Sequence, residues 1–532
     1  MNPVQLSIFS SKISAIADEM GAVLQRSGFS PNIRDRLDYS CAVFNTSAEL
    51  CAQAAHIPVH LGSMAFAMRS VVDMFDWAPG DAVIFNDPYL GGTHLPDVTL
   101  LSPAFVGDEL VGFVANRAHH ANIGSDSPGS MPVSSSLEEE GVIIPPTLLA
   151  RDGKLIKSVW IDLFSNTSCS ADSMSETEGD ISAQLSANQK GLIRLQALVE
   201  EMGRAVFNQA VDQLNQYSES LCEAAIRDIP NGIYAAKDLM DDDGQGNIDI
   251  PLCVNLVVED STLNFDFAGS SNQVAGNINC PLSVTAAGVY YVVRCLLPDY
   301  TPACAGVFRP VNVDSPEGSL LNAKRPAAVA AGNVETSSRV VDLVVKVLAQ
   351  AIPDRMPADS QGTMNNLAMG YIGNSNNAVS PNSSWSYYET IAGGIGANMQ
   401  SDGLSATHSH MTNTLNTPIE VLETNFPLRL REYSIRGDSG GPGVKFGGNG
   451  LIREYEFLSD ANVSLLTERR RHAPKGVQGG GNGLPGANLL DGKPIAPKTE
   501  FEVKKGSRLR IETPGGGGFG ESKILAENAN RD

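Results

Sequence analysis

Residues 85–99 read Phe-Asn-Asp-Pro-Tyr-Leu-Gly-Gly-Thr-His-Leu-Pro-Asp-Val-Thr, and residues 116–120 read Asn-Arg-Ala-His-His. Runs with the composition of buried strands lie beside both segments, at 81–87, 98–103 and 110–116. The first run leads into the glycine-containing loop, and the third delivers residues 117–120 at its end. The pattern therefore predicts a sheet with polar side chains gathered at strand ends.

Histidine is scarce in this chain, with 8 among 532 residues, yet it concentrates around this stretch. The polar residues concerned are His56, His60, His94, His119, His120, Asp87 and Asp97. Imidazole and carboxylate groups together bind divalent metals such as Zn, Mn and Fe. The pair Gly91-Gly92 lets backbone approach a bound ion or substrate closely. On spacing alone two alternatives stay open, namely a metal site and a set of buried, hydrogen-bonded histidines.

The residues upstream of this stretch add a carboxylate and two histidines. Asp38 stands where a charged loop is predicted to pass into a strand, a common place for a functional carboxylate. Pro58 lies between His56 and His60 and disfavours a regular helix there, so the two histidines are not expected to form a simple ligand pair one helical turn apart.

Composition limits the classes of protein and of partner. Apolar residues make up 42% and charged residues 18%, as in well-buried globular proteins. The net charge of −22 argues against binding to nucleic acid or to an anionic membrane surface. No apolar run reaches membrane-spanning length, no basic leader is seen, and the eight cysteines form no Cys-x-x-Cys pair. We expect a cytoplasmic protein with reduced thiols.

Periodicity and punctuation predict the architecture. Residues 2–27 are predicted to form a helix capped by Asn2 and Gln5, and 184–227, 283–296 and 337–352 have helical periodicity. Fifty-one glycines and 30 prolines indicate many turns. We predict an α+β, multi-domain chain with mixed and antiparallel sheets, several long helices and glycine-rich loops. The expected domains are an N-terminal metal-site domain (1–230), a central α/β domain (231–360) and a C-terminal glycine-rich, β-rich domain (361–532).

Several other motifs are weaker. His408 and His410 are a second metal candidate if they lie on one strand, or else part of a polar pocket or subunit surface. The acidic run 138–140 is typical of a solvated face, although one of its members can still point into a site. The turn at 241–244 lacks the spacing of a calcium loop and predicts a hairpin. The glycine-rich loops at 478–486 and 513–520 do not continue to Gly-Lys-Ser/Thr, so no nucleotide site is expected.

Several segments in the same order along the chain carry a resemblance to a known family. They are Ser-Pro-Asn-Ile-Arg-Asp-Arg-Leu-Asp-Tyr-Ser-Cys-Ala (30–42), His-Ile-Pro-Val-His-Leu-Gly-Ser-Met (56–64), Asn-Asp-Pro-Tyr-Leu-Gly-Gly-Thr-His-Leu-Pro-Asp (86–97), Arg-Ala-His-His-Ala (117–121), Ala-Gly-Asn-Val-Glu-Thr-Ser (331–337), His-Met-Thr-Asn-Thr-Leu-Asn-Thr-Pro (410–418) and Thr-Pro-Gly-Gly-Gly-Gly-Phe-Gly (513–520). Through them the sequence resembles the hydantoinase B / 5-oxoprolinase family along nearly its whole length.

The resemblance implies a metal-dependent subunit that opens a cyclic amide such as a hydantoin, 5-oxoproline or a lactam. The expected partner is a hydantoinase A-type subunit, which binds ATP and phosphorylates the substrate carbonyl, so that the two chains form a hetero-oligomer and ATP binds to the partner. The family's metal site maps onto His94, Asp97 and His119 here, with Asp38 as a fourth ligand for Zn, Mn or Fe.

The catalytic histidines predicted around that metal are His120, as general acid or base, and His56 and His60, as groups that orient the substrate. Two positions depart from the family pattern, because Asn122 stands where an acid is usual and Leu37 where an arginine is common. Two alternative functions stay open, a carboxylase component acting on a ketone and a catalytically silent scaffold for the A-type partner.

Overall fold

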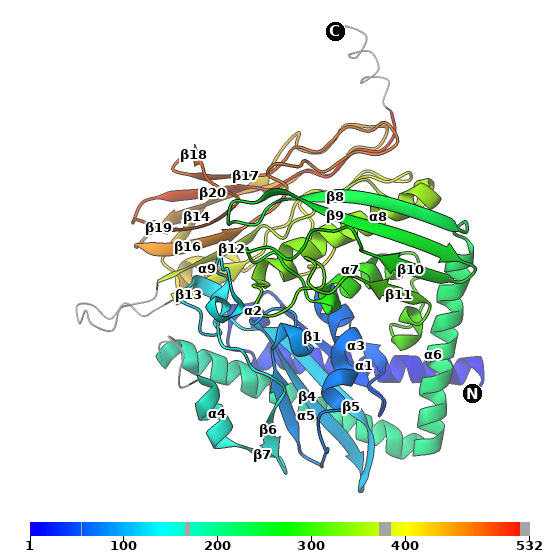
Figure 1. Cartoon of the computed structure of the whole chain (residues 1–532). Helices are drawn as coiled ribbons and strands as arrows, with labels where there is room; N and C mark the ends of the chain where they lie inside the picture. The colour runs from blue at the N-terminus through cyan, green and yellow to red at the C-terminus, as the bar shows by residue number, and fades with distance from the viewer. Residues whose placement is uncertain (55, 165–170, 372–384, 522–532) are drawn as a thin grey trace.

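The computed structural model describes residues 1–54, 56–164, 171–371 and 385–521 of the chain (Figure 1). Its described strands form four sheets of seven, four, four and five strands, accompanied by long helices and irregular segments. The predicted α+β architecture with mixed and antiparallel sheets is therefore confirmed. Among the described helices, none combines the length and the apolar character needed to cross a membrane.

The N-terminal part is a seven-stranded antiparallel sheet with helices on both faces. Its strand order is β2-β1-β5-β4-β3-β6-β7. The strands are β1 Tyr39–Phe44, β2 Leu50–Gln53, β3 Ala82–Phe85, β4 Asp97–Val106, β5 Glu109–His119, β6 Thr147–Arg151 and β7 Lys154–Leu155. The helices are α1 Pro3–Ser27, α2 Pro31–Arg34, α3 Pro58–Val72, α4 Lys157–Phe164, α5 Ala171–Met202 and α6 Arg204–Arg227.

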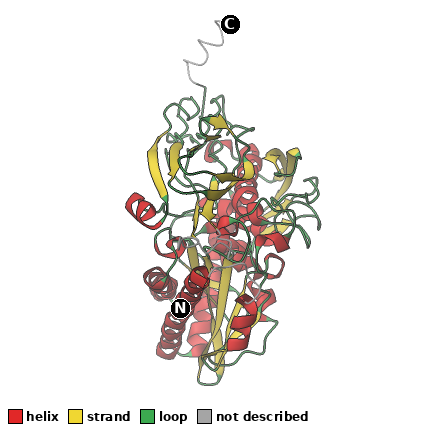
Figure 2. Cartoon of the chain, turned by 90° about the vertical axis from the view of Figure 1, so that its left-hand side faces the viewer, coloured by secondary structure: helices red, strands yellow, loops and turns green. Residues whose placement is uncertain are grey.

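Strand β1 shows that the sheet is buried on both faces, because successive residues of the strand belong to two different apolar cores. Val43 belongs to one apolar core with Phe9 of α1, whereas its neighbour Phe44 belongs to another with Met68 of α3. Successive strand residues point to opposite faces, so a strand covered on both sides reads as a continuous apolar run. Figure 2 shows helices flanking the strands in the lower part of the view.

Local sequence signals predicted the start of α1 correctly but missed a break between two later helices. The predicted cap of α1 is confirmed, because the Asn2 side chain accepts from Gln5 N at 2.9 Å and Gln5 Oε1 accepts from Asn2 N at 3.0 Å. The single helix predicted at 184–227 was wrong, since α5 ends at Met202 and α6 starts at Arg204. Gly203 between them has φ +79°, a conformation that breaks a right-handed helix and suits glycine.

The central part packs two helices on a smaller sheet. The strand order is β11-β10-β9-β8, with β10 and β11 parallel and the other pairs antiparallel. The elements are β8 Gly232–Asp242, β9 Ile248–Glu259, β10 Thr262–Asp266, α7 Leu282–Cys295, β11 Val311–Asp314 and α8 Ser337–Ala351. The hairpin predicted around the acidic turn is confirmed, because β8 and β9 pair directly across it.

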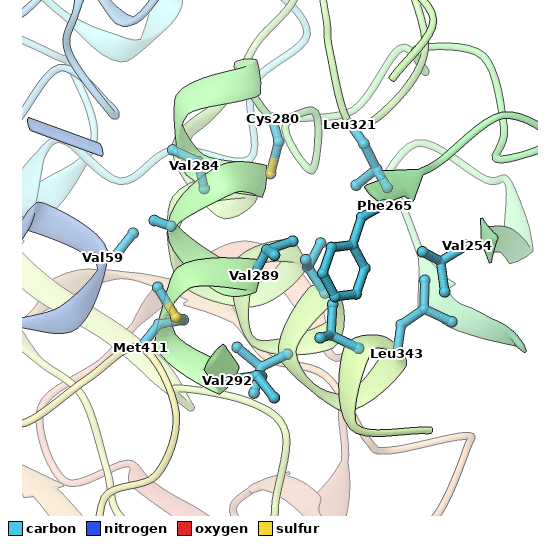
Figure 3. Packing of buried hydrophobic residues seen from close by; sticks show 14 of the residues in the cluster. Val59, Val254, Phe265, Cys280, Val284, Val289, Val292, Leu321, Leu343 and Met411 are labelled. Atoms are coloured by element: carbon cyan, nitrogen blue, oxygen red, sulfur yellow. The ribbon is translucent and has the colours of Figure 1, made fainter. Parts of the chain in front are cut away.

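The apolar core of this part continues into both neighbouring parts of the chain. Figure 3 shows Phe265 and Leu343 packed together on one side of α7, and Val59 and Met411 on the other. Val59 comes from α3 and Met411 from the C-terminal half, so buried side chains from the three predicted domains share one cluster. The domain boundaries themselves stay a prediction.

The C-terminal part contains the two remaining sheets. One has the order β13-β12-β16-β19 and the other β14-β15-β20-β17-β18. The elements are β12 Asn366–Tyr371, β13 Trp385–Glu389, α9 Ile419–Asn425, β14 Leu428–Ile435, β15 Leu451–Phe457, β16 Ala461–Leu466, β17 Ala487–Leu490, β18 Lys493–Pro494, β19 Lys498–Val503 and β20 Arg508–Glu512. The short helical turns of the chain are at 88–90, 128–130, 137–140, 305–308, 332–336 and 353–355, of which 332–336 is a π-helix.

The glycine-rich segments of this part pack backbone against backbone. A Cβ atom on Gly447 would lie 2.0 Å from Gly516 O, and one on Gly516 would lie 2.1 Å from Ile395 O. Hydrogen bonds cross the same layer, since Gly516 N donates to Gly448 O at 2.9 Å and Gly441 N donates to Gly516 O at 2.8 Å. The segments predicted as glycine-rich loops thus form a close-packed layer that leaves no room for side chains at these positions.

Candidate metal centre

Strand pairing brings the predicted ligands together. Asp97 begins β4 and His119 ends β5, and the antiparallel register places the two residues directly opposite each other. Strand β1 lies on the other side of β5, where His119 N donates to Asp38 O at 3.0 Å. His94 lies in the loop that precedes β4. His60 lies in the first turn of α3, whose first residue is Pro58, and proline is well tolerated at that position.

Asp97 is the hub of this cluster. Its carboxylate is fully buried and lies 3.2 Å from His60 Nε2, 3.2 Å from His94 Nε2 and 3.2 Å from His119 Nδ1. Thr93 Oγ1 also donates to Oδ2 at 2.6 Å. Burial alone would raise the pKa of Asp97, but the charges of His60 and His94 and the hydrogen bonds from His119 and His60 outweigh burial and hold the pKa well below its usual value. The carboxylate is therefore ionised, as a metal ligand must be.

The pKa values of His94 and His119 are shifted in opposite directions. Burial lowers the pKa of His119 below its usual value, which favours the neutral, metal-binding form. Burial also opposes the charged form of His94, but the charge of Asp97 raises the pKa of His94 overall. Within the described residues, His94 Nε2 and His119 Nε2 are buried without a hydrogen-bond partner. Buried polar atoms are normally paired, so these two nitrogens point to an additional ligand.

A small cavity lies among these groups. Its volume is about 20 Å³, and it is lined by Asp38, Ile57, Val59, His60, His94, Asp97, His119, Asn333, Val334, Met364, Tyr388, Thr390, Met411, Thr412 and Thr414. One donor atom each of His94, Asp97 and His119 lies within 4.8 Å of the others. A cavity of this size holds one ion or water molecule rather than an organic ring. Two imidazoles and a carboxylate around it are a donor set that fits Zn, Mn or Fe.

Asp38 and His60 complete the cavity on the side of β1 and α3. Asp38 Oδ1 lies 4.0 Å from His60 Nε2, and Asp38 Oδ2 lies 3.8 Å from the buried guanidinium of Arg36. Both predicted residues therefore line the same cavity as His94, Asp97 and His119, with Asp38 as the second carboxylate.

The remaining wall comes from segments far along the chain, and sequence reasoning missed it. Tyr388 stacks on His119 with ring centroids 4.3 Å apart and planes at 14°. Its hydroxyl accepts from Asn366 Nδ2 at 2.7 Å, and Arg36 Cζ lies over the ring, 4.7 Å from its centroid. Asn333 Nδ2 donates to Asp97 Oδ2 at 3.3 Å. Asn333 lies in 331–337, one of the segments that carry the family resemblance. The sequence around Tyr388 shows only an aromatic pair in a glycine-rich region and does not indicate a site.

The other predicted catalytic histidines do not line the cavity. His56 accepts from Cys41 N at 3.3 Å through Nδ1, and its ring packs edge-on against Tyr39. His120 Nε2 lies 2.9 Å from Gln184 Oε1 on α5. Asn122, the departure from the family pattern, accepts from Gly124 N at 2.7 Å in a local turn.

The weaker candidates lie elsewhere. His410 Nε2 is 2.8 Å from Asp342 Oδ1, and burial lowers the pKa of His408 to about 4. Asp342 also belongs to a second convergence of acids with Asp238 and Asp359. There the guanidinium of Arg469 pairs with Asp342 and lies 3.2 Å from Asp359, and Lys346 Nζ lies 2.5 Å from Asp238, so cationic side chains already pair with these acids. We interpret this second cluster as a buried ion-pair network.

Comparisons with known proteins agree with the resemblance. The family model described as Hydantoinase B/oxoprolinase matches residues 2–522. A 5-oxoprolinase from Dictyostelium discoideum is 36% identical over 99% of this chain, and this chain spans 41% of its length. The B-type subunit of a putative D-/L-hydantoinase from Pseudomonas sp. is 30% identical, with 98% of this chain and 90% of that protein covered.

Solved structures show the same fold. The crystal structure of the ATP-dependent caprolactamase from Pseudomonas jessenii superposes with a TM-score of 0.89 at 27% identity, covering 100% of this chain and 94% of that one. A nucleotide-free acetone carboxylase superposes with a TM-score of 0.85 at 17% identity, covering 100% of this chain and 78% of that one.

Proposed function

The chain belongs to the hydantoinase B/oxoprolinase family, and on that premise we propose that it is the metal-dependent subunit that opens an ATP-activated cyclic amide. The substrate class is a hydantoin, 5-oxoproline or a lactam, in keeping with the names of the 5-oxoprolinase, hydantoinase and caprolactamase relatives. One observation carries the proposal, namely the convergence of His94, Asp97 and His119 on a cavity the size of an ion.

In this proposal the chain holds a divalent ion through His94, Asp97 and His119, with Asp38 beside them. When bound, such an ion lowers the pKa of a coordinated water and polarises a carbonyl or phosphoryl oxygen. The lowered pKa values of Asp97 and His119 favour the ionised carboxylate and the neutral imidazole that ligands need. Their burial keeps bulk water away from the reacting groups.

His60 is the best placed of the three predicted catalytic histidines. Its Nε2 lies between two carboxylates, 3.2 Å from Asp97 Oδ2 and 4.0 Å from Asp38 Oδ1. We assign to this nitrogen the role of holding and returning a proton during ring opening. His56 and His120 then act by support, His56 through the backbone of β1 and His120 through Gln184 of α5.

A partner subunit supplies the activation step in this proposal. Because this chain spans 41% of the 5-oxoprolinase from Dictyostelium discoideum but 90% of a hydantoinase B-type chain, the same unit occurs both within a longer chain and as a separate subunit. We propose a hydantoinase A-type partner that binds ATP, and a hetero-oligomer as the working enzyme.

A carboxylase component is the second candidate, favoured by the shared fold of the acetone carboxylase. The two functions can be distinguished by the substrates that each consumes. A hydrolase consumes ATP and a cyclic amide, whereas a carboxylase consumes bicarbonate and a ketone.

The deciding experiment uses the complex co-expressed with its A-type partner. Hydantoins, lactams and 5-oxoproline are tested for ATP-dependent ring opening, ketones for bicarbonate-dependent consumption, and the purified complex for bound metal. We expect ring opening, at least one divalent ion per chain, and loss of both in His94→Ala. His472→Ala is the matched control, because His472 pairs with Asp249 far from the cavity. A metal-free complex in which His94→Ala is fully active would establish the scaffold alternative.

A further inference from the structure

Glu140 is a fully buried acid to which the proposed reaction gives no part. It ends the acidic run 138–140, whose first two members are exposed. Its Oε1 accepts from Ser134 Oγ at 2.8 Å, from Val329 N at 2.8 Å and from Ala330 N at 2.9 Å. These donors offset the cost of burying a carboxyl group, and two of them are backbone N–H groups, so Glu140 holds the 329–330 backbone.

The segment that Glu140 holds reaches the proposed ligands at two points. Ala330 O accepts from His94 Nδ1 at 3.4 Å, and Asn333 Nδ2 donates to Asp97 Oδ2 at 3.3 Å. Asn333 lies in the π-helix Gly332–Thr336, a rare conformation that is frequent at functional sites. A carbonyl accepts only from an N–H, so this contact places a proton on His94 Nδ1 and leaves Nε2 towards Asp97 and the cavity.

We propose that Glu140 is a positioning residue of this site, which fixes the Val329–Ala330 backbone so that Ala330 O orients His94 for ion binding. The inference rests on the proposed function in taking His94 as a ligand. Groups that fix the far nitrogen of a ligand histidine set its ring orientation and tautomer, and their loss typically lowers metal affinity by about 10–100-fold.

The test compares Glu140→Ala and Glu140→Gln with Glu139→Gln as the matched control. Glu139 is the neighbouring acid of the same run, but it is exposed and accepts from Ser135 instead of the 329–330 backbone. Zn²⁺ affinity of the folded full-length chain is measured by competition with a chelating dye. We expect a loss of about 10–100-fold for Glu140→Ala, most of the affinity restored in Glu140→Gln because its amide oxygen still accepts, and no change for the control.

Hydrogen–deuterium exchange of the metal-free chain provides a second readout. In Glu140→Ala we expect protection to fall in residues 327–334 and also in 86–97, the segment that carries His94. A residue that only stabilises the fold would lower the melting temperature but leave Zn²⁺ affinity and the 86–97 exchange as in wild type, and that result overturns the inference.

Two further outcomes are distinguished by this design. If Glu140→Ala does not fold, Glu140→Asp keeps the charge but withdraws the carboxyl from both N–H groups, and unchanged Zn²⁺ affinity in that variant overturns the inference. If the wild-type chain binds neither Zn²⁺ nor Mn²⁺, the proposed metal-dependent function fails, while the exchange of 86–97 still decides whether Glu140 positions His94.

Discussion

Replacing Gly516 with alanine is expected to destabilise the C-terminal part strongly. The new Cβ would lie 2.1 Å from Ile395 O, 2.3 Å from Ile395 C and 2.7 Å from Gly396 N, all of them backbone atoms. Ordinary contacts between such atoms begin near about 3.5 Å, so the two segments must separate by more than about 1 Å.

That separation breaks the two backbone hydrogen bonds of Gly516, to Gly448 and from Gly441. Each is worth about 1 kcal/mol, and overpacking a buried position costs about 1–3 kcal/mol more. The expected loss is therefore about 3–5 kcal/mol, which corresponds to a fall in melting temperature on the order of 10 °C for a unit of this size.

Scanning calorimetry of the full chain measures this, with Gly437→Ala as the control. A Cβ on Gly437 meets no atom within 4 Å, and its φ is not positive, so alanine there should be neutral or stabilise by about 0.4–1 kcal/mol through the unfolded state. Equal melting temperatures for the two variants would refute the close-packed layer. The layer is also connected to the proposed site. Gly394 N donates to Pro514 O within the layer, and Gly394 follows Thr390 of the cavity wall by four residues.

Three further predictions concern the site and its surroundings. Asp97→Asn should lower Zn²⁺ affinity by about 100-fold or more in titration calorimetry, because the buried charge that binds the ion is lost. Burial raises the pKa of Glu335 to about 8 from 4.5, so the folded state keeps a proton that the unfolded state releases and stability falls as pH rises between these values. Glu335→Gln should flatten that fall in melting curves from pH 5 to 8. Tyr388→Leu should slow ring opening by about 10-fold through loss of the ring stacked on His119, whereas Tyr388→Phe should retain most of the rate.

The fold was predictable where its signal is local. The α1 cap depends on two residues three positions apart, and the strands of the N-terminal sheet keep their apolar runs because both faces are covered. The break at Gly203 was missed because one glycine inside a helical pattern is tolerated in many helices, and only the path of α6 decides otherwise. The glycine-rich segments are loops, as predicted, but their packing into one layer was not predictable because its contacts join segments that lie far apart in the sequence.

The residues of the proposed site also differ in whether local sequence could predict them. Asp97 and His119 lie on one hairpin and His94 lies three residues before it, so their convergence follows from strand pairing, and the prediction of a metal site there rests on short-range information. Tyr388 and Asn333 reach the same cavity from other elements of the fold, and their local sequence does not show that they lie beside His119 and Asp97.

The acidic run 138–140 shows what the sequence withholds. Its three glutamates look alike, and charge alone predicts that all of them face solvent. Only Glu140 is buried, because two N–H groups that lie 189 and 190 residues further along the chain converge on its carboxylate. Burial of that one acid depends on where the central part of the chain packs, and the same packing brings Ala330 O to His94. The proposed ligands thus stand out in the sequence as a local group of histidines and a carboxylate, whereas the group that we propose orients them is defined only by the folded chain.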